Sequence, residues 1–150
     1  MKKLILITTL FCSMTATTIA QTTEKAIGLR LGYSAEVSFL YSINSSHRIE
    51  ADLGVVPIGA YNGFFLNGVY QWTWDLSDYL TKGFGWYVGV GGGIGGFHKS
   101  FGLTLAGQIG LEYNFDFPLQ LTLDYRPGFS LVPDILPTLT GFAVSARYRF

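Results

Sequence analysis

The amino-acid sequence predicts an all-β protein: an eight-stranded antiparallel up-and-down transmembrane β-barrel that follows a cleaved N-terminal signal peptide. Apolar and polar residues alternate along almost the whole chain after residue 20, and this period of two is typical of β-strands. Aromatic residues make up 16% of the 150 residues and charged residues only 13%, about half the roughly 25% of an ordinary soluble domain. No run of 18 consecutive apolar residues follows the leader, so a chain that meets a membrane would cross it as strands.

Residues 1–20 have the order of parts of a secretory signal peptide. Two lysines precede an apolar stretch from Leu4 to Met14, and small residues occupy the −3 and −1 positions before residue 21. The apolar stretch is too short to cross ~30 Å of hydrocarbon as a helix. A lipoprotein signal is disfavoured because a bulky residue directly precedes Cys12, which lies inside the apolar stretch. We therefore expect residues 21–150 to form a single barrel domain.

The charge balance argues against a nucleic-acid partner. Ten basic and ten acidic residues give a formal net charge of zero, so the chain has no excess of cations to neutralise a phosphate backbone. The low charge and high aromatic content also exclude a disordered chain.

The last ten residues show the strand pattern most clearly. Every second residue from Phe142 to Phe150 is apolar, and the residues between them are small or charged. A tilted strand needs about 9–11 residues to cross a bilayer, which matches this length. The same alternation predicts seven further strands with apolar faces at 27–33, 37–43, 49–55, 64–76, 84–94, 103–115 and 119–125. Periplasmic turns are then expected at 44–47, about 77–83 and 116–118, and outer loops at 34–35, 57–62, 96–101 and 127–140.

The size of the side chains indicates which face of each strand points outward. An eight-stranded barrel has an interior just wide enough to be filled by side chains, and the many aromatic rings of the apolar face would overfill it. Placed outside, the rings contact lipid, and those near strand ends form the aromatic girdles expected at the two membrane interfaces. The residues predicted for these girdles are Tyr33, Trp72, Trp74, Trp86, Tyr113 and Tyr125.

The charged residues lie on the opposite face. A lysine or arginine that faces lipid at mid-depth costs about 2–4 kcal/mol, whereas opposite charges can pair inside a narrow lumen. We predict an internal network in which Arg126, Arg147 and Arg149 bind Glu112, Asp124 and Glu50. Its full predicted membership is Arg30, Glu50, Asp52, Glu112, Asp124, Arg126, Arg147 and Arg149. The alternative is that these charges form the solvated face of a soluble sandwich or a lipocalin-like binder.

The ending Arg-Tyr-Arg-Phe at 147–150 resembles the C-terminal signal of Gram-negative outer-membrane barrels. The wider pattern resembles a family of small outer-membrane barrel proteins of Bacteroidota. The fragments that carry this resemblance are 28–33, 85–91, 110–113, 124–127 and 147–150. The resemblance implies an outer-membrane location, contact with outer-membrane lipid, and insertion by the barrel-assembly machinery with the help of periplasmic chaperones. The last strand would be the recognised element, through Phe142, Val144, Tyr148 and Phe150.

The sequence contains little that indicates catalysis, and we expect no enzyme, cofactor or metal site. Gly91–Gly96 matches G-x-G-x-x-G, but a strand follows where a dinucleotide site needs a helix. The two histidines, His47 and His98, fall at opposite ends of the predicted barrel, which disfavours a metal site. An alternative is a lipid-modifying enzyme at the outer rim that uses His98, Ser100 and Asp134.

The function expected is therefore that of an integral outer-membrane barrel with a polar, side-chain-filled lumen and a structural or interaction role. Its outer loops would bind a small apolar ligand or a surface partner, and the inward glycines of 91–96 would leave room for neighbouring side chains or for a ligand. A narrow transport barrel for small solutes is the main alternative. The sequence specifies no oligomeric state.

Overall fold

The computed structural model describes residues 24–58, 61–97, 100–132 and 135–150, so the predicted signal peptide lies outside the described residues. None of these ranges contains a helix long and apolar enough to span a membrane. The strands of these ranges are β1 (Lys25–Gly32), β2 (Ala35–Ser42), β3 (His47–Ile58), β4 (Tyr61–Asp75), β5 (Phe84–Phe97), β6 (Ser100–Asn114), β7 (Leu119–Tyr125), β8 (Gly128–Val132), β9 (Leu136–Thr138) and β10 (Phe142–Arg149).

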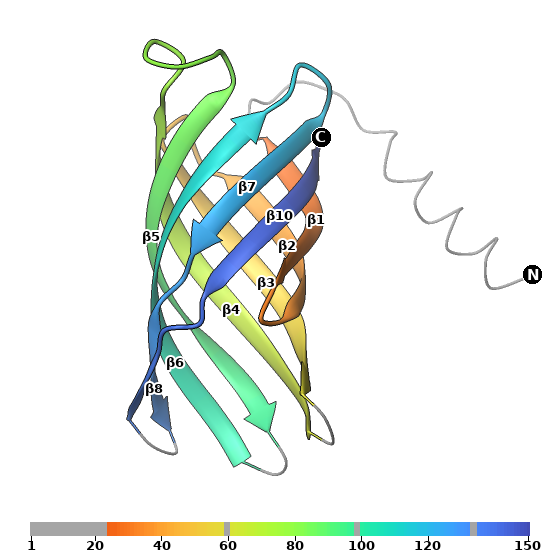
Figure 1. Cartoon of the computed structure of the whole chain (residues 1–150), viewed down its shortest axis with the longest axis vertical. Helices are drawn as coiled ribbons and strands as arrows, with labels where there is room; N and C mark the ends of the chain where they lie inside the picture. The colour runs from red at the N-terminus through yellow and green to blue at the C-terminus, as the bar shows by residue number, and fades with distance from the viewer. Residues whose placement is uncertain (1–23, 59–60, 98–99, 133–134) are drawn as a thin grey trace, which may run out of the picture.

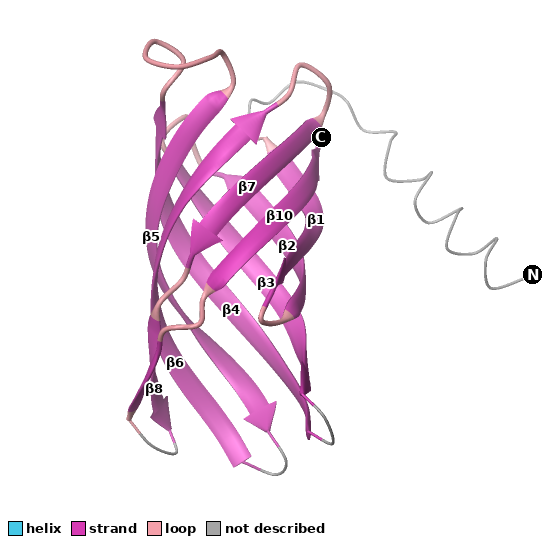
Figure 2. Cartoon of the chain, viewed as in Figure 1, coloured by secondary structure: helices cyan, strands magenta, loops and turns pink. Residues whose placement is uncertain are grey.

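Eight of these strands close into one barrel (Figures 1 and 2). Neighbouring strands follow the order β5-β4-β3-β2-β1-β10-β7-β6, and β6 pairs with β5 to complete the ring. Every pair in this ring is antiparallel. The predicted eight-stranded antiparallel barrel is therefore confirmed.

The strand register requires the strands to tilt strongly against the barrel axis. Pairing that starts at Leu29 on β1 reaches Leu103 on β6 in one direction around the ring and Tyr113 in the other. These two residues are ten positions apart on the same strand. Such a stagger accompanies a tilt of about 35–45° in closed barrels.

Both ends of the described chain lie at one end of the barrel, which we call the terminal end. Here the Lys25 amide donates a hydrogen bond to the Phe150 carbonyl at 3.1 Å, and the Phe150 amide donates to the Lys25 carbonyl at 2.8 Å. The hairpins β1–β2, β3–β4 and β5–β6 point toward the opposite end, which we call the distal end (Figure 1). The two ends differ in how the strands are connected.

The connections at the terminal end agree with the predicted turns and are fixed by local chemistry. The Asn44 side chain accepts hydrogen bonds of 2.9 Å from the amides of Ser46 and His47 and so shapes the β2–β3 turn. Gly83, just before β5, has a φ of 99°. A Cβ at this position would lie 2.4 Å from the Asn114 carbonyl oxygen, so only glycine fits.

Two of the predicted distal loops are shorter than expected, because the strands that lead to them are longer. The loop predicted at 57–62 is largely strand, since β3 continues to Ile58 and β4 begins at Tyr61. The loop predicted at 96–101 is likewise reduced, since β5 continues to Phe97 and β6 begins at Ser100. Their glycine, proline and asparagine content indicated turns, but pairing across a continuous antiparallel ladder stabilises these residues as strand.

The prediction of a single long outer loop at 127–140 is also wrong. β8 pairs with β6 beyond the end of β7, and β9 pairs with β8. The wall formed by β7 is therefore interrupted at Pro127, which has no amide hydrogen to donate, and resumes as β8. The Pro127 carbonyl still accepts a hydrogen bond of 2.9 Å from the Gly107 amide, which keeps β7 and β8 on one line along β6.

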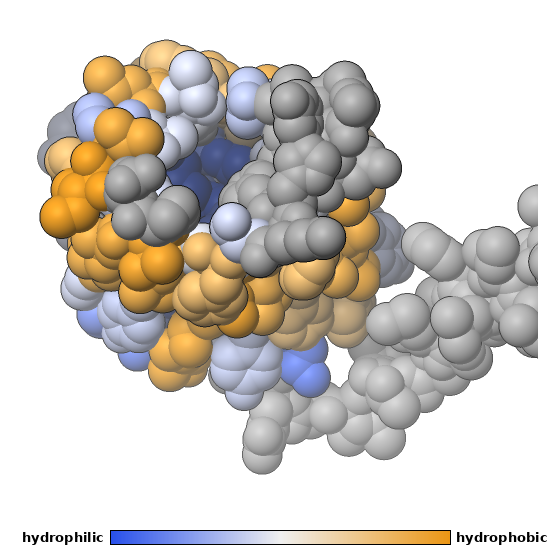
Figure 3. All heavy atoms as spheres, turned by 90° about the horizontal axis from the view of Figure 1, so that it is seen from below, coloured by the Kyte–Doolittle hydropathy of each residue, from blue (hydrophilic) through white to orange (hydrophobic). Residues whose placement is uncertain are grey.

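The apolar face of each strand is outside and the polar face is inside. Leu29, Val90, Ile109, Leu123 and Val144 are each at least half exposed on the outer surface. Viewed from the distal end, apolar side chains surround a hydrophilic centre (Figure 3). The barrel is therefore the reverse of a soluble protein, in which the apolar residues would fill the interior.

Candidate functional site

A cluster of charged and polar side chains fills the middle of the barrel, and we call it the polar plug. Its members come from β1 to β7 and β10, or directly follow β7, and all are buried. They are Arg30, Glu36, Arg48, Glu50, Asp52, Gln71, Tyr87, Gln108, Glu112, Asp124, Arg126 and Arg147.

Arg126 is the most highly connected arginine of the plug. It directly follows β7, and its guanidinium donates to Glu50 and to Asp52, both on β3, with N–O distances of 2.6 Å. A third, longer contact of 3.5 Å joins it to Glu36 on β2. One guanidinium therefore holds three carboxylates that would otherwise repel one another inside the lumen.

Arg30 extends the network toward the seam between the first and last strands. Its guanidinium lies 2.8 Å from Glu36 and 2.6 Å from Asp124. The Ser34 hydroxyl at the β1–β2 turn also donates to Glu36, at 2.6 Å. This end of the plug thus joins the β1–β2 hairpin to the end of β7.

Toward the terminal end, charged pairs alternate with neutral hydrogen-bonding groups. Arg147 on β10 lies 3.0 Å from Glu50, whose other contacts include the Gln71 amide at 2.7 Å. Arg48 binds Glu112 and places its guanidinium 4.6 Å from the centre of the Tyr87 ring. This cation–π contact holds the arginine between a carboxylate and an aromatic face.

The plug is closed to solvent at its centre. Glu50, Asp52, Gln71, Tyr87 and Arg147 all have relative exposures of 0%. A polar vestibule of about 780 Å³ lies on the terminal side, lined among others by Arg48, Glu112, Asn114, Gln120 and Arg149. A second cavity lies on the distal side. The described part of the chain therefore places two hollows in the lumen with the buried plug between them.

Seven of the eight residues predicted for the lumen network lie in this plug, but Arg149 does not. Its guanidinium donates instead to the backbone carbonyls of Phe115, at 2.7 Å, and Phe117, at 3.3 Å, in the β6–β7 turn. Arg149 is the last residue of β10, level with this turn, and the turn carbonyls are nearer to it than any plug carboxylate. The prediction that Arg149 binds a carboxylate is therefore wrong.

The sequence analysis also left out two charged members of the plug, Glu36 and Arg48, and mispaired others. Glu36 and Arg48 lie on the polar face by the same alternation, so the period-two signal was sufficient to include them. The partner of Glu112 is Arg48, and that of Asp124 is Arg30. Alternation identifies the face of a strand, but the partners depend on the register between strands.

The structure places the predicted girdle aromatics at different positions along the strands. Trp74 and Trp86 stack with ring centroids 4.6 Å apart near the terminal end, where Tyr113 also contacts Phe84 at 4.8 Å and Trp72 contacts Tyr70 at 5.1 Å. Tyr125, in contrast, pairs with Ile109 in the middle of β6 and packs on Phe142 at 4.4 Å. Tyr33 lies at the tip of the β1–β2 hairpin and is 57% exposed.

The residues predicted as the insertion signal share one face of β10. Phe142, Val144, Tyr148 and Phe150 all point outward, and each is at least 47% exposed. The described structure places them along the seam where β10 meets β1 and β7.

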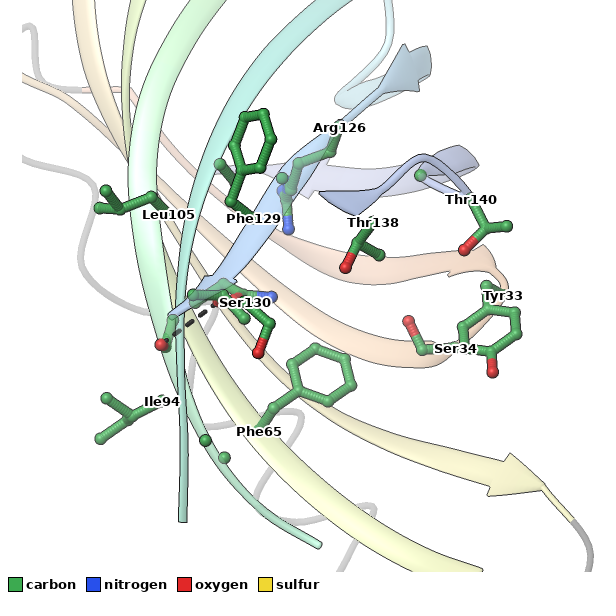
Figure 4. Close-up of a pocket in the computed structure, with 18 of the residues that line it drawn as sticks. Tyr33, Ser34, Phe65, Ile94, Leu105, Arg126, Phe129, Ser130, Thr138 and Thr140 are labelled. Atoms are coloured by element: carbon green, nitrogen blue, oxygen red, sulfur yellow. Dashed lines mark hydrogen bonds between the residues drawn. The ribbon is translucent and has the colours of Figure 1, made fainter. Parts of the chain in front are cut away.

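The distal cavity has a volume of about 470 Å³ and lies on the distal side of the plug (Figure 4). Arg30, Glu36 and Arg126 of the plug line it at its base. Half of the residues that line it are glycine, alanine, serine or threonine, and their small side chains leave this part of the lumen unfilled. They include Gly93, Gly95, Gly102, Thr104 and Ser130, and Phe65 also lines the cavity. The glycines of β5 thus leave space in the lumen, one of the two roles that the sequence suggested for them.

The features considered as chemical sites do not assemble in the described residues. Gly91–Gly96 lies within β5, paired on both sides, so its amides are used in the sheet. His47 contacts the Tyr70 hydroxyl at 2.9 Å, and no three metal-ligating side chains of the described residues converge. Ser100 is exposed at the start of β6, whereas His98 and Asp134 lie outside the described residues.

No family model and no curated protein matches this sequence. Solved structures match its fold. The N-terminal β-barrel domain of OprF from Pseudomonas aeruginosa has a TM-score of 0.65 and 11% identity, over 85% of this chain and 96% of that one. Neisserial surface protein A has a TM-score of 0.59 and 14% identity, over 85% of this chain and 94% of that one.

The outer membrane protein Ail of Yersinia pestis, solved in a phospholipid bilayer nanodisc, has a TM-score of 0.51 and 16% identity. It aligns over 85% of this chain and 98% of that one. The chain therefore has the fold of the small eight-stranded barrels represented by these three proteins.

Proposed function

We propose that this protein is an integral outer-membrane barrel whose lumen conducts no solutes and whose distal cavity presents a binding site for a small apolar ligand. The observation that carries the proposal is the combination of an apolar outer surface with a buried, ion-paired plug that closes the lumen. Its role is then structural or interactive rather than catalytic.

The distribution of side chains supports a lipid environment. Large apolar residues on every strand of the ring point outward, whereas the arginines and carboxylates of the plug point inward. A monomeric soluble protein rarely exposes apolar patches of more than a few hundred Å². In a bilayer the same surface is solvated by acyl chains, and the buried charges are kept away from them.

The connections support an orientation with the terminal end in the periplasm. Barrels of this class have an even number of strands, both chain ends on the periplasmic side, and longer walls or loops outside. The distal end has the longer strands β3 to β6 and the additional pair β8–β9. The outward residues of β10 would then face the assembly machinery during insertion, as the resemblance of the C-terminus implies.

The plug supports a barrel that does not conduct. Moving an ion or solute along the axis would require several buried salt bridges to open, and breaking one buried pair costs about 3–5 kcal/mol. The distal cavity ends on this plug, so a ligand that enters from outside binds there rather than crossing. Its largely apolar walls favour an apolar ligand.

Membrane fractionation and gel mobility of the full chain test the location. We expect the protein in the outer-membrane fraction, extracted only by detergent, with an unheated band that migrates differently from the boiled band. Recovery in the aqueous fraction without detergent would contradict the proposal and favour the soluble lipocalin-like alternative.

Electrical recording of the purified protein in a planar bilayer tests the closed lumen. We expect no stepwise conductance from a preparation that shows the heat-dependent mobility of a folded barrel. A sustained single-channel conductance from the same preparation would overturn the closed lumen and favour a narrow transport barrel.

A further inference from the structure

We propose that the distal cavity opens sideways into the outer leaflet of the membrane and takes up an acyl chain of a membrane lipid. The opening is a notch in the barrel wall on the distal side of the β1–β2 hairpin, between β3 and β9. This inference rests on the proposed membrane location and identifies the ligand class and its path of entry.

The notch results from a difference in strand length. The β1–β2 hairpin turns at Tyr33 and Ser34, and the last partner of β3 on β2 is Ala35, which pairs with Val55. β3 continues to Ile58, paired only with β4. Three residues correspond to about 10 Å of wall that has no strand beside it. In Figure 1 the β1–β2 hairpin ends well short of the β3–β4 and β5–β6 hairpins.

The other side of the notch is formed by β9. Leu136–Thr138 pairs with β8 alone, and no pairing of the described residues joins it to β1 or β3. The edges of β3 and β9 therefore border the notch on its two sides, and the β1–β2 turn borders it toward the terminal end. The barrel wall is closed on the terminal side of this turn and open on one side distal to it.

The distal cavity extends to this notch. Its lining includes Tyr33 and Ser34 from the hairpin tip as well as Thr138 and Thr140 from the β9 side. Figure 4 shows these four residues along one side of the cavity, with Phe65 below them and Leu105 and Phe129 at the opposite side. The cavity is thus bordered by both sides of the gap and is not confined to the barrel axis.

The notch lies within the apolar belt of the outer surface and not beyond its distal edge. At its lower margin Tyr33 and Phe142 are 57% and 67% exposed. The longer strands carry exposed apolar side chains further toward the distal end, including Phe64, Phe101 and Phe129. If these residues contact acyl chains, the shorter hairpin tip is immersed with them, because an apolar belt of a barrel is about 25 Å tall.

The sequence of the two edges disfavours a strand as the occupant. β3 contains Pro57 and β9 contains Pro137, each in the segment that borders the notch. Proline cannot donate a ladder hydrogen bond, and it is found on edge strands that do not recruit a further strand. The notch is therefore suited to a side-chain or lipid occupant and not to an additional strand.

The charges at the base of the cavity indicate which part of a lipid enters. Both arginines of the lining are already paired, Arg30 with two carboxylates and Arg126 with three. Neither is left to bind a phosphate headgroup. The walls above them expose glycine backbone and small or aromatic side chains, so the acyl chain enters while the headgroup stays outside the notch.

A tryptophan probe in the cavity tests this inference. We would make Phe65→Trp in a chain with Trp72, Trp74 and Trp86 replaced by phenylalanine, and refold it into phosphatidylcholine vesicles with or without brominated acyl chains. The reference is Phe64→Trp in the same background, because the neighbouring residue points outward and is 64% exposed. We expect brominated lipid to quench the probe at 65 to an extent comparable to the probe at 64.

A variant in which the cavity is filled by a side chain serves as the control. It distinguishes quenching by lipid inside the cavity from quenching by lipid on the other side of the barrel wall. Thr104→Phe adds a ring inside the cavity, and Ile109→Phe adds one to the outer face of the same strand, at a residue that does not line the cavity. We expect Thr104→Phe to remove most of the quenching of the probe at 65 and Ile109→Phe to leave it unchanged. Equal quenching in both variants would overturn the inference, as would a probe quenched by aqueous iodide and not by brominated lipid.

A second measurement covers the case in which the tryptophan replacements do not fold. Native mass spectrometry of the chain with its own tryptophans should show one retained phospholipid, which Thr104→Phe loses and Ile109→Phe keeps. Retention by Thr104→Phe would contradict the inference. Heat-dependent gel mobility of each variant reports membrane folding separately, so a failure to insert would count against the proposed function and not against the notch.

Discussion

The polar plug and the distal half of the lumen follow one sequence pattern but have opposite properties. In the plug, inward positions hold arginine, glutamate, aspartate, glutamine and tyrosine, and these buried side chains close the lumen. In the distal half, inward positions hold mainly glycine, serine and threonine, and a cavity of about 470 Å³ remains. Alternation determines which residues face inward, and side-chain volume then determines whether the lumen is closed or hollow.

The outer surface shows the same division. Around the plug, eight strands form a complete ring, whereas beyond the β1–β2 hairpin the wall is incomplete. The ion pairs lie where the ring of strands is complete, and the small inward residues lie where the wall is incomplete. Variants in the plug and in the distal half should therefore differ in stability.

Removal of Arg126 should have the largest effect, because it leaves three buried carboxylates without their shared cation. We expect Arg126→Ala to lower the free energy of unfolding by about 3–5 kcal/mol, the cost typical of breaking a buried ion pair. Urea unfolding of the folded barrel in lipid vesicles measures this loss. Arg149→Ala is the matched control, since that guanidinium contacts only backbone carbonyls at the terminal end. Equal losses in the two variants would show that the plug contributes no special stability.

Extra volume in the plug should have the next largest effect. A Cβ at Gly110 on β6 would lie 2.5 Å from the Tyr87 ring, whereas a Cβ at Gly107 on the same strand would have no atom closer than 3.9 Å. We expect Gly110→Ala to cost about 1–3 kcal/mol through overpacking and Gly107→Ala to be tolerated. The same unfolding measurement compares them, and a harmless Gly110→Ala would mean that the plug is less tightly packed than described.

The fold could be predicted from the sequence because its determinants are local. Alternation from Phe142 to Phe150 and the proportion of aromatic residues are visible without any knowledge of pairing. The lumen network was only partly predictable, since the pairing of Arg48 with Glu112 depends on the register of strands far apart in sequence. Arg149 shows the limit most clearly: it shares the polar face with Arg147, but its height along the barrel places it beside a turn.

The distal half was the less predictable one for a similar reason. Pro127 and Pro137 indicated a loop, but residues 128–132 pair as β8 because an edge of β6 is available to them, and residues 136–138 pair with β8 as β9. The notch could not be predicted either, because it depends on the difference in length between two hairpins whose ends contain similar turn residues. Turn signals give the positions of chain reversals to within a few residues, and here those few residues decide the shape of the wall.

A smaller effect is expected at a neutral member of the plug. The Tyr87 hydroxyl donates to Asp124 at 3.3 Å, while Asp124 keeps its contact with Arg30. We expect Tyr87→Phe to lower the free energy of unfolding by about 0.5–1.5 kcal/mol, the net value of one hydrogen bond. Urea unfolding beside Tyr70→Phe, whose hydroxyl contacts the exposed end of His47, separates the buried bond from an exposed one. A larger loss from Tyr70→Phe would contradict the central role of the plug.

The smallest effect is expected where the lumen is hollow. Thr104→Phe adds a whole ring to the distal cavity, far more volume than Gly110→Ala adds to the plug, yet we expect stability to change by only about 0.5 kcal/mol. The hydroxyl lost from Thr104 donates a single long bond of 3.3 Å to the Gly93 carbonyl, and the cavity of about 470 Å³ offers room for the ring. Urea unfolding in the same vesicles compares the free energies of unfolding of Thr104→Phe and Gly110→Ala. If the larger residue in the cavity proved more costly than the smaller one in the plug, the distal lumen would already be filled by the protein, and neither a ligand nor an acyl chain could occupy it.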